Sequence, residues 1–265
     1  MSIFRWAMSV AASLLLCSIA FAETARVAGG CTVPPEMTRF SVKLTNTARA
    51  IRSGKPLIIV AVGSSSTEGI GASDPAHAYP ALLGGELRQR WPQVPVTVIN
   101  KGVRGEIASE MLARFDRDVL SHHPQLVIWQ TGSNHALRRE SIEGYADTIR
   151  LGISRLRAAS ADVVLMDPQF APRVLARPKH LMVVDSIGAV GNDMKVAVFR
   201  RYAVMRHWVS SGQFKLEDIV TSDGLHLNDV SYSCIARLLA GSVVAATEPA
   251  IEILQPYQGA KNTSR

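Results

Sequence analysis

A serine near the front of this 265-residue chain, and an aspartate and a histidine near its end, have the chemistry of a nucleophilic site. Ser65 lies in Gly63-Ser64-Ser65-Ser66-Thr67-Glu68-Gly69, directly after the apolar run 57–62, and Asp223 precedes His226 by three positions. A histidine that takes the proton of a serine hydroxyl makes it a nucleophile, and a carboxylate on the other ring nitrogen orients the histidine. The three residues therefore suggest acyl transfer. Each also fits a simpler role, as a loop serine, a helix-capping aspartate or an exposed histidine.

Two more polar turns follow predicted strands and offer hydrogen-bond donors. They are Asn100-Lys101-Gly102-Val103-Arg104-Gly105 and Gly132-Ser133-Asn134-His135. The tetrahedral intermediate of acyl transfer carries an oxyanion that needs donors already in place. We expect the backbone N–H groups of Ser65 and Gly105 and the side-chain amide of Asn134 to supply them. Asn134 would equally suit a left-handed turn position.

Apolar runs and helical periodicity alternate along the chain, with strands predicted at 57–62, 94–99, 126–129, 163–166 and 196–199. Helices are predicted between and around them, at 36–52, 79–91, 106–121, 140–158, 180–190, 202–211 and 230–247. Alternating strands and helices favour parallel βαβ units in one doubly wound sheet. Ligands bind beyond the carboxyl ends of such strands, so we expect the polar turns to meet at one edge of the sheet.

The segments around Ser65, Gly105, Asn134 and His226 resemble, in order, the four sequence blocks of the SGNH hydrolases, or GDSL esterases/lipases. The resemblance covers about residues 56–245. It implies a three-layer α/β/α sandwich with a central parallel five-stranded sheet, a flavodoxin-like α/β fold. It also implies Ser65 as nucleophile, Asp223 and His226 as its partners, and Ser65, Gly105 and Asn134 as the oxyanion hole, with no metal or organic cofactor. Two positions depart from the family pattern, because Ser64 and His135 stand where the family usually has aspartate.

The function that follows is a serine esterase acting on acyl esters, with short-chain or acetyl groups favoured. On the same three residues, a sugar O-acetyltransferase and a lysophospholipase or thioesterase stay open, as does a non-catalytic carbohydrate-binding relative. The chain lacks the glycine patterns of phosphate-binding loops, which disfavours a nucleotide-binding protein. Thr67 replaces the last glycine of Gly-x-Ser-x-Gly, which disfavours the other common hydrolase fold.

The net charge of +7 is spread along the chain without a dense Lys/Arg run, so no nucleic-acid partner is predicted. The loops of the proposed edge nevertheless carry Arg104, Arg138 and Arg173, together with Lys101, Arg139, Arg177 and Lys179. These cations suggest that their side chains contact the substrate. They also suggest that the substrate, a small-molecule or carbohydrate acyl ester, is anionic. The alternative is a solvated rim, partly neutralised by Glu106 and Glu140. No Cys/His/carboxylate spacing indicates a metal site.

The two ends of the chain have compositions of their own. Residues 1–22 have the pattern of a secretory signal peptide cut after Ala22, which predicts a periplasmic or secreted protein with no stable membrane anchor after cleavage. The arm and helix 23–55, the hydrolase-like domain 56–255 and the polar tail 256–265 follow. Cys31 and Cys234 then remain, as one disulfide or as two buried thiols.

Overall fold

The computed structural model describes residues 30–248. The predicted signal peptide 1–22, the first residues of the arm and the tail 256–265 lie outside the described residues. Five parallel strands form one sheet in the spatial order β2-β1-β3-β4-β5. The strands are β1 (Leu57–Gly63), β2 (Val96–Gly102), β3 (Leu126–Gln130), β4 (Asp162–Met166) and β5 (Ala197–Phe199).

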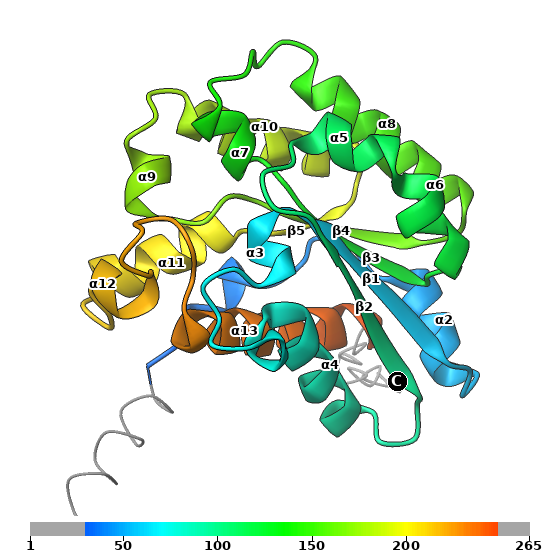
Figure 1. Ribbon diagram of the computed structural model, residues 1–265. Coiled ribbons are helices and arrows are strands. Elements are labelled where there is room, and N and C mark those ends of the chain that lie inside the picture. The colour runs from blue at the N-terminus through cyan, green and yellow to red at the C-terminus, as the bar shows by residue number, and fades with distance from the viewer. Residues whose placement is uncertain (1–29, 249–265) are drawn as a thin grey trace, which may run out of the picture.

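Helices cover both faces of the sheet, which makes the predicted three-layer α/β/α sandwich (Figure 1). The fold prediction is therefore confirmed. The longer helices are α2 (Thr45–Arg52), α4 (Tyr79–Arg90), α8 (Tyr145–Ala158), α10 (His180–Asp193), α11 (Arg201–Ser210) and α13 (Asp229–Thr247). The short helices are α3 (Ser65–Glu68), α5 (Ala108–Ala113), α6 (Phe115–Asp118), α7 (Ser133–Leu137), α9 (Pro172–Leu175) and α12 (Leu216–Ile219), with 3₁₀ turns at Pro35–Met37, Pro75–His77 and Leu120–His122.

Side chains of β1 explain why the sheet needs two helical layers. Ile59 and Ala61 face the layer of α2, α4, α11 and α13, whereas Val60 and Val62 face the layer of α5, α6, α8 and α10. All four are fully buried. Alternate residues of a strand point to opposite faces, so an unbroken apolar run requires cover on both sides. The sequence pattern of 57–62 is thus matched by the packing.

Three predicted helices are shorter or more broken than expected, and of these 140–158 only loses its first residues, since α8 begins at Tyr145. The segment 36–52 is helical only in a short 3₁₀ turn and in α2. Just before α2, Leu44 donates its N–H to the carbonyl of Ala246 in α13 instead of to a carbonyl one turn earlier, as a continuous helix would require. The segment 106–121 is divided into α5, α6 and a 3₁₀ turn. The chain leaves helical geometry at Arg114 (φ −106°, ψ 9°), whose buried side chain reaches the sheet edge.

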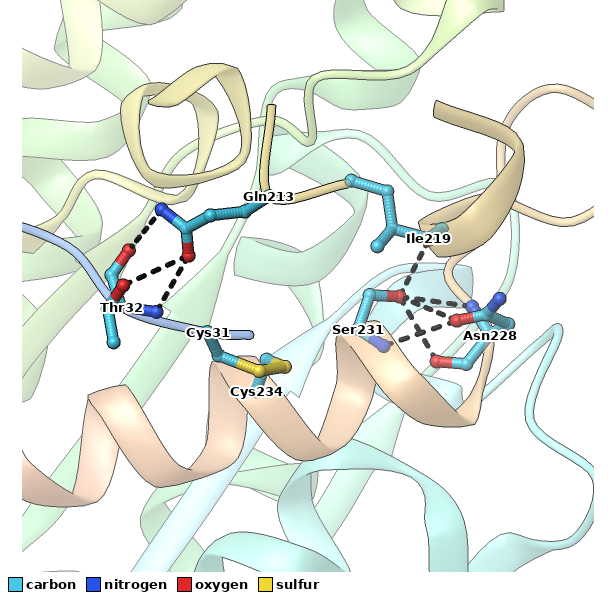
Figure 2. The surroundings of a disulfide bond; sticks show 7 residues. All are labelled: Cys31, Thr32, Gln213, Ile219, Asn228, Ser231 and Cys234. Carbon is cyan, nitrogen blue, oxygen red and sulfur yellow. Dashed lines mark hydrogen bonds between the residues drawn. A yellow bond between two sulfur atoms is a disulfide. The ribbon is translucent and has the colours of Figure 1, made fainter. Parts of the chain in front are cut away.

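Cys31 and Cys234 form a disulfide in the structure, with their Cα atoms 5.6 Å apart (Figure 2). The bond joins the N-terminal arm to the second turn of α13. Beside it, Gln213 accepts hydrogen bonds from the backbone and hydroxyl of Thr32 at 3.0 and 3.1 Å. The arm is therefore held along α13 both covalently and by polar contacts.

Within residues 30–248, α13 alone is long and apolar enough to cross a membrane by length and composition. The window that passes this test is 56% buried in the protein, as in a core helix of a globular fold.

Candidate active site

Ser65 is the first residue of α3, immediately beyond the carboxyl end of β1. The turn between them is tight, since a Cβ at Gly63 would overlap the Thr67 hydroxyl and the side-chain oxygen of Gln130. That oxygen accepts hydrogen bonds from the backbone and hydroxyl of Ser64 at 3.0 and 3.1 Å, and from Thr67 at 3.1 Å. Glycine and a buried polar cluster thus fix the serine at the sheet edge.

The structure brings Ser65, His226 and Asp223 into one hydrogen-bonded chain. His226 Nε2 lies 3.0 Å from Ser65 Oγ, and His226 Nδ1 is hydrogen-bonded to Asp223 Oδ2. An ionised carboxylate only accepts hydrogen bonds. Nδ1 therefore carries the proton, and Nε2 is left to accept from the serine hydroxyl. This is the arrangement that activates a serine.

Asp223 is held in the ionised form by its surroundings. Partial burial alone would raise the pKa of its carboxyl, but four donors lower it well below its usual range. The donors are the backbone N–H groups of His226 and Leu225, the imidazole and the Thr221 hydroxyl. Multiple hydrogen bonds to the charged form favour that form. The carboxylate can therefore orient the imidazole across the neutral pH range.

The three predicted oxyanion donors belong to the same edge of the sheet. Neither the backbone N–H of Ser65 nor that of Gly105 donates to another group within residues 30–248. Gly105 has φ +82°, a left-handed conformation that glycine adopts at little cost. Asn134 Nδ2 donates to the carbonyl of Glu106 at 3.0 Å, which brings the α7 amide against the turn that carries Gly105.

A buried glutamine that sequence analysis did not single out links two parts of the site. Gln169 Oε1 accepts from Ser133 Oγ at 2.6 Å and from Arg201 Nη2 at 2.9 Å. Its Nε2 donates to the carbonyl of Leu225 at 3.1 Å. Gln169 therefore joins the turn before Asn134 to the loop before His226, and the fully buried Arg201 anchors it.

A second buried arginine braces the ends of β1 and β2. Arg114 Nη2 donates to the carbonyl of Lys101 at 2.9 Å and binds Glu106 Oε2 at 2.7 Å, with a longer contact of 3.4 Å to the carbonyl of Gly63. Nothing in the local sequence marks Arg114 as buried, which hid this role. The signal that could have revealed it is its position directly before Phe115 and two residues after Leu112, within the apolar part of the predicted helix.

The cations expected around the site fall into two groups. Arg104 binds Glu68 through its backbone and guanidinium, and Arg138 binds Glu110 at 2.9 Å and the carbonyl of Gly105 at 2.7 Å. These two arginines therefore brace the turn at Gly105, and their charges are paired. Arg173 is exposed and forms no ion pair within the described residues, and its backbone N–H donates to the carbonyl of Gly224.

The two departures from the SGNH pattern are both buried. Ser64 is part of the Gln130 cluster described above. His135 stacks against Tyr145 with ring centroids 4.1 Å apart, and its Nε2 is hydrogen-bonded to the carbonyl of Ser141. Burial lowers the pKa of His135, partly opposed by that hydrogen bond. Both residues thus shape the loops, and no three potential metal ligands gather anywhere in residues 30–248.

Named sequence relatives of the chain are esterases. It is 26% identical over 173 residues to an arylesterase of Vibrio mimicus, covering 63% of this chain and 78% of that protein. It is 30% identical over 108 residues to thioesterase 1/protease 1/lysophospholipase L1 of Escherichia coli K12, covering 41% of this chain and 49% of that protein. The second match thus spans about half the length of that relative.

Solved structures show the same fold at low identity. A two-domain esterase active on acetylated mannans superposes with a TM-score of 0.69 at 20% identity, covering 82% of this chain and 57% of that chain. A variant of Axe2, an acetylxylan esterase from Geobacillus stearothermophilus, superposes with a TM-score of 0.61 at 17% identity, covering 71% of this chain and 94% of that chain.

A family model covers nearly all of the described chain. The model of the Non-GDSL lipase-like family matches residues 30–249. The match agrees with the predicted class of ester hydrolase and confirms the predicted relationship to the SGNH hydrolases. The chain therefore belongs to the Non-GDSL lipase-like family.

Proposed function

We propose that the protein is a serine esterase that removes acetyl or other short acyl groups from carbohydrates through an acyl-enzyme. The observation that carries this is the hydrogen-bonded chain from Ser65 through His226 to Asp223. A serine placed this way, beside free backbone N–H groups, has the parts that acyl transfer requires. The named relatives support the acyl-ester class, and the acetylxylan and acetylated-mannan esterases support a carbohydrate ester.

The groups of the site act in sequence in this proposal. Ser65 Oγ attacks the ester carbonyl carbon while its proton passes to His226 Nε2. The resulting oxyanion accepts hydrogen bonds from Ser65 N–H, Gly105 N–H and the Asn134 amide. The C–O bond then breaks, and His226 returns the proton to the departing sugar hydroxyl. A water molecule then attacks the carbonyl carbon of the acyl-enzyme while its proton passes to His226 Nε2. The bond to Ser65 Oγ breaks, His226 returns the proton to Ser65 Oγ, and the acid is released.

A thioesterase or lysophospholipase is the second candidate, because the Escherichia coli relative carries those names. The two functions differ in the acyl group and the leaving group, and share the catalytic residues. Turnover of 4-nitrophenyl esters from acetate to palmitate, alongside acetylated xylan and an acyl-CoA thioester, separates them. A preference for acetate and for the polysaccharide supports the first candidate.

The role of Ser65 is tested by labelling and by substitution. A fluorophosphonate probe should label the wild-type protein at Ser65 and should leave Ser65→Ala unlabelled. Ser65→Ala should abolish turnover of 4-nitrophenyl acetate while the melting temperature stays within a few degrees. Ser66→Ala is the matched control, because Ser66 is buried beside Ser65 and its hydroxyl forms no hydrogen bond within the described residues. Normal turnover by Ser65→Ala would refute the assignment, as would wild-type protein that resists the probe and hydrolyses no ester.

A further inference from the structure

A cavity of about 380 Å³ lies beside the proposed active site, between α7 and the start of α10. One wall is formed by His135 and Ala136 of α7, and the opposite wall by Pro178 and Val183. These side chains give the cavity an apolar floor. Its size is within the range of pockets that hold small organic ligands.

Three cations line this cavity, Arg139, Arg177 and Lys179, against one carboxylate, Glu140. None of the three forms an ion pair with a carboxylate of residues 30–248. They thus differ from Arg104 and Arg138, whose charges are paired. A concave surface that carries excess positive charge concentrates anions.

Arg177 adds an independent observation. Its Nε atom is buried and has no hydrogen-bond partner in the described chain. A guanidinium N–H that has lost water without gaining an acceptor is costly, and bound carboxylate is the acceptor that guanidinium groups match best. Arg177 also lines the cavity, and a small movement of its side chain would bring the covered Nε–H to a ligand there.

The cavity and the Ser65 site share two supporting elements. The helix α7 carries Asn134 on the site and His135 and Ala136 on the cavity. Arg173 of α9 donates its backbone N–H to Gly224 in the loop of Asp223 and His226, and the chain then runs on into Arg177. Figure 1 shows α7 between α9 and α10, with α9 next to the loop that precedes α13. An extended substrate can therefore occupy both places.

We propose that this cavity binds a carboxylate-bearing sugar unit, a uronic acid, of the same carbohydrate whose acyl group reaches Ser65. This inference rests on the proposed esterase function. The carboxylate would face Arg177 and Lys179, and the C–H face of the sugar ring would lie on Ala136, Pro178 and Val183. The enzyme would thus select acidic acetylated glycans over neutral ones.

The test compares acetylated trigalacturonate with an acetylated galactotriose that lacks the carboxylates. Wild-type protein should show a higher kcat/KM for the acidic substrate, and added salt should reduce that preference. Arg177→Gln/Lys179→Gln should lower the preference at least about tenfold, since both cations that would face the carboxylate lose their charge. Arg52→Gln is the matched control, an exposed arginine of α2 at the opposite edge of the sheet, and should keep the preference.

A binding measurement separates the cavity from catalysis. Unacetylated trigalacturonate should bind Ser65→Ala protein in calorimetry, and the Arg177→Gln/Lys179→Gln changes should weaken this binding about tenfold or more. If the preference and the binding were equal with and without these two cations, the proposed binding of a uronic acid in the cavity would be wrong, even in an active esterase. Binding to the cavity by a protein that hydrolyses neither substrate would instead overturn the proposed function. Melting temperatures establish that every variant is folded.

Discussion

His226 Nε2 lies 3.0 Å from Ser65 Oγ, although the two residues are 161 positions apart. The contact exists because β1 delivers Ser65 to the carboxyl edge of the sheet, while the loop before α13 crosses that same edge. The strand order reverses between β1 and β3, because β2 and β3 lie on opposite sides of β1. Such switch points are where open α/β sheets bind ligands.

The carboxylate behind the histidine should be essential for turnover. Asp223→Asn replaces an acceptor by an amide that can donate toward Nδ1, which favours the wrong imidazole tautomer. We expect kcat on 4-nitrophenyl acetate to fall by about 10³-fold or more. Asp229→Asn makes the same change six positions later, on a carboxylate that binds Ser73 instead of the histidine. Similar losses in both variants would contradict the role of Asp223.

The amide of Asn134 should act mainly on the transition state. Asn134→Ala removes one oxyanion donor, so kcat should drop on the order of 100-fold with little change in KM. The measurement is steady-state kinetics on the same ester. Asn46→Ala is a suitable comparison, because Asn46 is hydrogen-bonded to Asp162 at the far edge of the sheet. A loss that appears only in KM would indicate that Asn134 binds ground-state substrate.

Gln169 should act as a positioning residue. Gln169→Glu keeps the acceptors for Ser133 and Arg201 but sets an oxygen against the carbonyl of Leu225. The repulsion should displace the neighbouring His226 and lower kcat by about tenfold, with a smaller effect on KM. Gln125→Glu makes the same change where a glutamine contacts the backbone at the other sheet edge, and should spare kcat. If kcat followed the melting temperature equally in both variants, Gln169 would have only a structural role.

The disulfide should stabilise the fold considerably. Cys31 and Cys234 enclose a sequence separation of 203 residues, and long loops lose the most unfolded-state entropy on cross-linking. Cys31→Ser/Cys234→Ser should lower the free energy of unfolding by about 2–5 kcal/mol. Denaturant melts of this variant, and of wild-type protein with and without reductant, provide the measurement. Identical unfolding midpoints for oxidised and reduced wild type would show that the bond adds no stability.

His135 should make the fold sensitive to mild acid. Burial places the pKa of His135 in the folded protein below its value in the unfolded chain, so the unfolded chain binds more protons below about pH 6.5. Stability should therefore fall as the pH drops through this window. His135→Phe keeps a ring beside Tyr145 without the titration, so its stability relative to wild type should improve from pH 7 to pH 5. The measurement is the melting temperature of both proteins at each pH from 7 to 5. A constant difference in melting temperature between His135→Phe and wild type across this range would disprove the effect.

The fold and the reacting groups could be predicted because they depend on local patterns. The run 57–62 is apolar at every position, and only a strand covered on both faces accommodates it. Ser65 and Asn134 lie in the first turns of short helices just beyond β1 and β3, and His226 lies in the loop before α13, all at the carboxyl edge that follows from the alternation of strands and helices. Topology placed these residues at one edge, and the resemblance to the SGNH blocks supplied the expectation that Ser65 and His226 meet there.

The supporting polar residues could not be predicted in this way. Gln169 connects Ser133, Leu225 and Arg201, and Arg114 binds carbonyls in the last residues of β1 and β2. Such contacts depend on the packed arrangement of distant segments, and no short spacing in the sequence encodes them. The same dependence breaks the predicted helix 106–121, since the chain bends where Arg114 turns inward.

The loop with Asp223 and His226 leads directly into α13, whose first turn is capped by Asn228 and whose second turn is tied to the arm. A nascent polypeptide still attached to the ribosome thus holds its nucleophile long before its base has been synthesised. During refolding, turnover can return only once α13 has docked and brought His226 to Ser65.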